Sequence, residues 1–90
     1  MDVCAHIIVE GLVQGVGFRY YAHRHATQLG LTGFAANRFD GSVEIEVEGN
    51  RSAVEEFIKV VKVGPSSAQV SNLSIEWKNC KSPSSHFEIR

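Results

Sequence analysis

Residues 11–19 read Gly-Leu-Val-Gln-Gly-Val-Gly-Phe-Arg, and this stretch decides how the chain begins to fold. Before it, residues 3–10 alternate between a more apolar and a more polar face, which predicts a strand with its apolar face turned inward. After it, apolar side chains recur at helical spacing from Phe18 to Leu29, and Gly30 is suited to end that helix. The stretch is therefore a glycine-rich connection between a strand and a helix.

The same connection has the chemistry of a phosphate site. Glycines let backbone N–H groups turn toward one point and let a ligand approach closely. The start of a helix adds unpaired N–H donors and a partial positive charge, and an arginine adds a planar guanidinium suited to phosphate oxygens. We therefore expect this loop to bind an anion, and phosphate above all. The expected binding residues are Gln14, Gly15, Val16, Gly17, Phe18 and Arg19.

The rest of the chain alternates between strand and helix patterns. Further strands are predicted over residues 31–37, 42–48 and 73–78, with a short fifth strand at an edge over 87–90. A turn over 38–41 contains the Asp-Gly hairpin signal. Ser52 and Glu55 have the spacing of a capping box at the start of a second helix, which Gly64 and Pro65 end.

This order of elements predicts an α+β fold. It is the ferredoxin-like β-α-β-β-α-β sandwich, with two helices on one face of a mostly antiparallel sheet and a short C-terminal fifth strand. In this topology the glycine loop, Asn37 and the loop over 64–69 fall at one end of the sheet. The last strand runs toward the same end and brings Arg90 and the C-terminal carboxylate back to it.

Cys4 and Cys80 fall at the opposite end, on strands that are neighbours in the usual order. They form no Cys-x-x-Cys pair, which argues against a zinc ribbon or a thioredoxin-type motif. We expect two structural thiols, because a reducing cytosol disfavours disulfides. A disulfide is the alternative, and it depends on a Cα separation that sequence alone does not supply.

The composition is that of one soluble globular domain over residues 1–90. The net charge is −1, from nine basic and ten acidic residues, so there is no broad field to hold nucleic acid or an anionic membrane. No apolar run is long enough to span a bilayer, and the N-terminus lacks the pattern of a secretory signal. We expect a cytoplasmic monomer.

Other phosphate chemistries do not fit the sequence. No arginine follows either cysteine at the spacing that a cysteine phosphatase needs, and there is no Asp-x-Asp pair after a strand. The glycine loop lacks the lysine of a Walker motif, and Tyr20 stands where a dinucleotide fingerprint has its third glycine. The four histidines form no metal-binding pair at helical spacing. We therefore expect no metal and no cofactor.

Two motifs give the chain a resemblance to the acylphosphatases that runs nearly from end to end. The first is residues 11–19. The second is Gly-Phe-Ala-Ala-Asn over 33–37, followed by Asp-Gly-Ser-Val over 40–43 and by Gly49 at the family's spacing, and the closing Phe-Glu-Ile-Arg also resembles the family.

The resemblance implies hydrolysis of the carboxyl-phosphate bond of acyl phosphates, giving a carboxylate and inorganic phosphate, with no metal and no covalent intermediate. It implies that Arg19 binds the substrate, that Asn37 positions the attacking water, and that the backbone of residues 14–18 wraps the phosphate. The chain departs from many relatives at Ala22, where they carry a hydroxyl residue. It departs again at Gln69 and Ser71, where they carry arginine and aspartate.

The chemistry is consistent with so small a set of residues. The leaving group is a carboxylate whose conjugate acid has a pKa of about 4, so no strong general acid is required. The remaining tasks are to neutralise the phosphoryl oxygens and to hold a water in line. We expect Arg19 and Asn37 to be the catalytic residues, assisted by the loop amides.

Two other functions remain as alternatives. One is a non-catalytic module that binds an anion such as carbamoyl phosphate, as in larger hydrogenase-maturation proteins. The other is an RNA-binding domain, which shares the topology but uses aromatic and basic residues on the exposed sheet face. The glutamates at 44, 46 and 48 disfavour it, because they would repel phosphates. We expect Tyr20, Phe34 and Trp77 to pack rather than to contact a ligand.

Overall fold

A computed structural model describes residues 2–80 and 85–90. Within these residues the elements follow the predicted order: β1 (Asp2–Leu12), α1 (Phe18–Gln28), β2 (Thr32–Asn37), β3 (Val43–Asn50), α2 (Arg51–Val63), β4 (Gln69–Lys78) and β5 (Phe87–Ile89). Gly30, with a φ of 72°, follows α1 as expected. The sequence also predicts a turn over residues 79–85, of which 81–84 lie outside the described residues.

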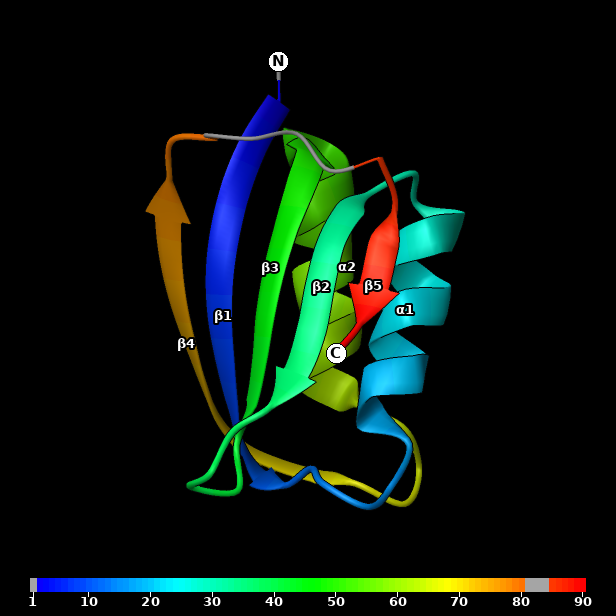
Figure 1. Ribbon diagram of the computed structural model, residues 1–90, viewed down its shortest axis with the longest axis vertical. Coiled ribbons are helices and arrows are strands. Elements are labelled where there is room, and N and C mark those ends of the chain that lie inside the picture. The colour runs from blue at the N-terminus through cyan, green and yellow to red at the C-terminus, as the bar shows by residue number, and fades with distance from the viewer. Residues whose placement is uncertain (1, 81–84) are drawn as a thin grey trace.

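The strands form one sheet in the order β4-β1-β3-β2-β5, and α1 and α2 both cover one face of it (Figure 1). Every neighbouring pair is antiparallel except β2 and β5, which are parallel. This confirms the ferredoxin-like α+β fold with a fifth strand at an edge. Because β5 runs with β2, it carries Arg90 toward the end of the sheet where β2 stops.

The core lies between the sheet and the two helices. Alternation along the central strands sends every second side chain inward, as the sequence predicts. The fully buried larger side chains are Ile7, Val9, Val13, Phe18, Val43, Ile45, Val47, Val54, Phe57 and Val61. The opposite face of the sheet is polar, where His6 contacts Glu44 at 2.8 Å and Lys78 contacts Glu46 at 3.0 Å.

β1 extends two residues beyond the predicted strand, and β4 begins four residues earlier than predicted. A bulge after Glu10 shifts the register, so that Gly11 pairs with Val70 and Leu12 with Gln69. Gly11 has a φ of 126°, and a side chain there would overlap the main-chain oxygen of Gln69. The sheet therefore requires glycine at position 11, and the loop predicted to bind phosphate is confined to residues 13–17.

The predicted capping box of α2 is wrong. The helix begins at Arg51, and its cap is Asn50, whose side-chain oxygen accepts from the backbone N–H of Ser52 at 3.0 Å. Glu55 instead accepts from Arg51, one helical turn away, at 3.2 Å. Asn50 takes the capping role because it has an extended conformation directly before the first helical residue, which lets its oxygen reach the second N–H of the helix.

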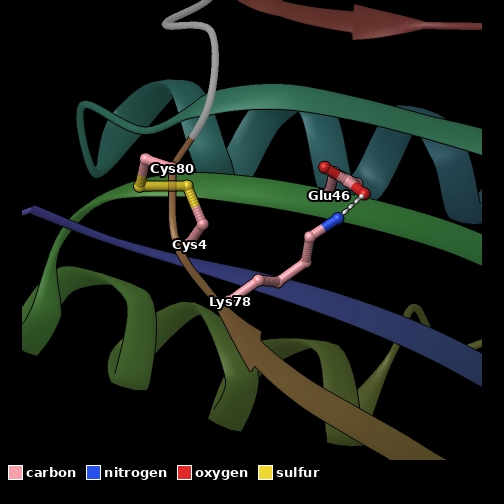
Figure 2. The surroundings of a disulfide bond; sticks show 4 residues. All are labelled: Cys4, Glu46, Lys78 and Cys80. Atoms are coloured by element: carbon pink, nitrogen blue, oxygen red, sulfur yellow. Dashed lines mark hydrogen bonds and ion pairs between the residues drawn. A yellow bond between two sulfur atoms is a disulfide. The ribbon is translucent and has the colours of Figure 1, made fainter.

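The expectation of two free thiols is also wrong in this structure, because Cys4 and Cys80 form a disulfide (Figure 2). Cys4 pairs with Lys78 across the β1–β4 ladder, so Cys80 lies two residues past the ladder partner of Cys4. The Cα atoms are 5.3 Å apart, within the range of disulfides. The bond therefore ties the segment that leaves the edge strand β4 to the inner strand β1.

Candidate active site

Three connections meet at the end of the sheet opposite the disulfide. They are the glycine loop before α1, the hairpin between β2 and β3, and the segment between α2 and β4 (Figure 1). Gln14 donates from its side-chain amide to the main-chain oxygens of Arg38 and Ser42, at 2.8 and 2.9 Å. Ser67 donates to the main-chain oxygen of Val16 at 3.1 Å. The predicted convergence of these segments is thereby confirmed.

The start of α1 is open. Its N-cap residue is Gly17, which has a φ of 76° and a ψ of 20°, and no side chain in the described part of the protein caps the helix. Its first turn also has no acidic residue. Gly15 has a similar φ of 74°, and a side chain at either glycine would meet nothing within 4 Å. The backbone donors of this helix start are thus left for a ligand.

A pocket of about 160 Å³ lies at this helix start. It is lined by Val13, Gly15, Gly17, Phe18, Arg19, Tyr20, Asn37 and Ile89. This volume is well below the roughly 300–1,000 Å³ of sites for drug-sized ligands. Its size and its donors suit a small anion rather than a nucleotide.

Arg19 is held at the pocket by the last residues of the chain. Its Nη1 donates to the main-chain oxygen of Arg90 at 2.7 Å. Arg90 is positioned in turn by its N–H, which donates to the main-chain oxygen of Ala35 at 2.8 Å, and by its guanidinium, which lies 4.0 Å from the centre of the Phe34 ring. A guanidinium has five N–H donors, so this contact leaves most of them for a ligand.

Asn37 reaches the pocket because it is the last residue of β2. Because side chains alternate between the two faces along β2, Asn37 is on the same face as the buried Ala35. The helices cover this face. The next residue begins a tight hairpin, where the N–H of Arg38 donates to the oxygen of Ser42 at 2.9 Å. Hydrogen bonds from the Ser42 hydroxyl and N–H to Asp40 hold the pKa of that carboxyl below its usual value. These hydrogen bonds brace the hairpin that follows Asn37.

The structure brings most of the expected site residues together. Arg19, Asn37 and three of the loop residues line one pocket. The side chains of Gln14 and Val16 do not line it; their contacts hold the loop against the neighbouring segments. Val13, Tyr20 and Ile89 also line the pocket and were not expected to. Tyr20 could have been predicted from the sequence, because it directly follows Arg19 at the start of a helix. Ile89 could not, because it reaches the site only through the pairing of β5 with β2.

The departures at Ala22, Gln69 and Ser71 lie outside the pocket lining. Ala22 is fully buried on the inner face of α1, and Gln69 is the first residue of β4.

Among the described residues, one group of side chains of the kinds that bind metal ions has its possible ligand atoms within 4.8 Å of one another. The group is Cys4, Glu48 and Cys80. Its two sulfurs are bonded to each other, and it is at the other end of the sheet. No helix in the described part of the chain is long and apolar enough to cross a membrane.

Comparison with known proteins gives a consistent result. The acylphosphatase family model matches residues 5–89. The acylphosphatase of Geobacillus kaustophilus is 44% identical over 84 residues, which are 93% of this chain and 89% of that protein. The crystal structure of acylphosphatase from Bacillus subtilis has a TM-score of 0.95 and 38% identity, covering 98% of each chain. The structure of full-length HypF in its phosphate- and nucleotide-bound form has a TM-score of 0.89 and 28% identity, but this chain covers only 12% of it.

Proposed function

The chain belongs to the acylphosphatase family, and on this premise we propose how it hydrolyses acyl phosphates to a carboxylate and inorganic phosphate. Arg19 and the backbone amides of residues 14–18 bind the phosphoryl group, Asn37 positions the attacking water, and no covalent intermediate forms. The observation that carries this proposal is that the glycine loop, Arg19 and Asn37 line one small pocket.

The phosphoryl group occupies the open start of α1. There the uncapped N–H groups and the positive end of the helix face its oxygens. Arg19 adds a charged donor whose position is held by Arg90. Each preorganised donor of this kind contributes roughly 3–4 kcal/mol to transition-state stabilisation. The site therefore lowers the barrier mainly by holding negative charge.

Asn37 supplies the orientation of the nucleophile. Its amide has both a donor and an acceptor, so it holds a water without becoming charged. The water attacks phosphorus in line with the departing carboxylate, which leaves as an anion at neutral pH. Holding the water in place removes an entropic cost from the reaction. No general acid and no metal is required by this scheme.

Hydrolysis of benzoyl phosphate tests the proposal directly. We expect turnover in the presence of EDTA, little turnover of phenyl phosphate, and competitive inhibition by inorganic phosphate, because phosphate occupies the same cradle. Loss of activity on chelation, or equal turnover of the phosphomonoester, would contradict it.

Substitution of Asn37 tests the role of the water. Asn37→Ala should lower kcat about 100-fold while inorganic phosphate still binds, because the cradle is intact. Asn72→Ala is the matched control, since Asn72 is exposed on β4 and bonds to Glu10 away from the pocket. A variant at position 37 with unchanged kcat would remove Asn37 from the mechanism.

We further propose that residues 1–90 act as one domain and as a monomer in the cytoplasm, without nucleic acid or membrane. Coverage of 98% of the Bacillus subtilis enzyme's chain supports the single domain. The redox state of Cys4 and Cys80 in cells tests the cytoplasmic location, because a reducing cytosol keeps thiols free. Thiol labelling of protein taken directly from cells would show which form is present.

A second candidate function is a non-catalytic module that binds an anion such as carbamoyl phosphate, and the similarity to HypF, whose structure is phosphate-bound, favours anion binding. Such a module would bind inorganic phosphate but would not turn over benzoyl phosphate, so the assay above separates the two. An RNA-binding role has weaker support, because the exposed sheet face carries Glu44 and Glu46, paired with His6 and Lys78. Retardation of single-stranded RNA at low salt would revive it.

A further inference from the structure

Tyr20 lines the pocket and has no part in the mechanism above. It lies in the first turn of α1, and 63% of its surface is exposed, so the expectation that it packs is wrong. Ile89, at the end of β5, lines the same pocket and is 44% exposed. Two large and mainly apolar side chains are therefore left open to solvent beside the pocket that Arg19 and Asn37 also line.

Contacts along α1 show which way Tyr20 faces. Its ring stacks on His23, with centroids 6.5 Å apart, and His23 meets the edge of Phe87 on β5 at 6.1 Å. The three residues from His23 back to Tyr20 span about 4.5 Å of helix, and the two from Phe87 to Ile89 span about 6.6 Å of strand. Because α1 and β5 run in opposite directions (Figure 1), Tyr20 and Ile89 lie at a similar level.

We propose that Tyr20, assisted by Ile89, is the platform on which the acyl part of the substrate rests, and that it makes the enzyme favour aromatic acyl phosphates. This rests on the proposed function. In phosphoryl transfer the attacking and leaving oxygens are roughly in line. A water held by Asn37 on β2 therefore directs the leaving carboxylate away from β2 and toward α1, where Tyr20 is exposed. An aromatic acyl group gains both apolar burial and ring contact there.

The chain also contains a matched control. Phe39 is fully exposed in the hairpin that follows Asn37. It lines a separate hollow of about 340 Å³ together with Asn37, Arg38 and Asp40. Both aromatic residues are near the site, but Phe39 is on the side from which the water attacks. If in-line geometry decides where the acyl group lies, only Tyr20 contacts it.

The test compares kcat/KM for benzoyl phosphate and acetyl phosphate in the wild type and three variants. Tyr20→Ala should lower the value for benzoyl phosphate about 5- to 10-fold and leave acetyl phosphate unchanged. Tyr20→Phe should retain the preference of the wild type, because the ring makes the contact. Phe39→Ala should change neither substrate. Alanine is favourable at an exposed helical position, so Tyr20→Ala is expected to fold.

An equal loss on both substrates in Tyr20→Ala, or no loss on either, would overturn the platform. A loss of the benzoyl preference in Phe39→Ala would overturn it as well, and would place the acyl group on the other side. Failure of the underlying function has a different signature, since the wild type would then hydrolyse neither compound. Inhibition by inorganic phosphate should be the same in wild type and Tyr20→Ala, because the proposed platform contacts the acyl group and inorganic phosphate has none.

Discussion

The two helices begin at opposite ends of the molecule and begin in different ways. The N-cap of α1 is Gly17, beside the pocket, and no side chain among the described residues caps this helix. The N-cap of α2 is Asn50, whose side chain accepts from the N–H of Ser52, at the end of the sheet where the disulfide joins Cys4 and Cys80. A cap consumes the donors that an anion would use. The difference indicates that one end of this small fold is built for stability and the other is left open for binding.

Removal of Arg19 should give the largest effect, and it should fall on activity alone. We expect Arg19→Ala to lower kcat/KM for benzoyl phosphate by about 1,000-fold, because a charged donor to the phosphoryl oxygens is lost. Urea denaturation should show little change in stability. Arg24→Ala, an exposed position on the same helix, is the control. A comparable loss in that variant would mean that general helix charge, not the site, is responsible.

A charge at the N-cap of α1 should give the next largest effect. Gly17→Asp places a carboxylate at the pocket, where it repels the phosphoryl group, and we expect a loss of about 100-fold in kcat/KM. Gly17→Asn has nearly the same shape without the charge and tolerates a positive φ, so its loss should be clearly smaller. Equal losses in both variants would show that the backbone of glycine matters here more than the open positive end of the helix.

Removal of the disulfide should affect stability and spare activity. We expect Cys80→Ser to lower the free energy of unfolding by about 2–4 kcal/mol, because the bond closes a long loop of the unfolded chain. The kcat/KM of the folded protein should not change. Reductant should reproduce the loss in the wild type and have no effect on the variant. A fall in kcat/KM on reduction would mean that the two ends of the sheet are coupled.

Removal of the α2 cap should give the smallest effect. Asn50→Ala is expected to cost about 1 kcal/mol in the free energy of unfolding, measured in urea, with no change in kcat/KM. Asn50→Asp should retain most of the stability, since aspartate is also a good cap. If Asn50→Ala were neutral, the contrast between the two helix starts would have no energetic meaning.

Most of the fold was predictable because it depends on short-range patterns. The alternation in β1 and β3, the apolar stripe of α1 and the turn at Asp40-Gly41 each follow from residues close in sequence, and all are confirmed. The errors were at element ends. The early start of β4 and the bulge before Gly11 come from the pairing of two strands, which no local pattern records.

The features of the site also divide into those that local sequence predicts and those that depend on the tertiary structure. The motif of residues 11–19 and the position of Asn37 were readable from residue types and their order, because glycine, arginine and asparagine carry their chemistry with them. The contact of Arg19 with Arg90 joins residues 71 positions apart, and the exposure of Tyr20 beside Ile89 depends on where β5 lies. The pairing of Cys4 with Cys80 depends on which strands are neighbours. By itself, then, the sequence determined the elements, their inward faces and the groups proposed to bind phosphate, all of which follow from local backbone preference and side-chain chemistry. Only the tertiary structure decided how those groups are held, what surrounds them and which cysteines meet, because strand order and register set every distance between residues that are remote in the chain.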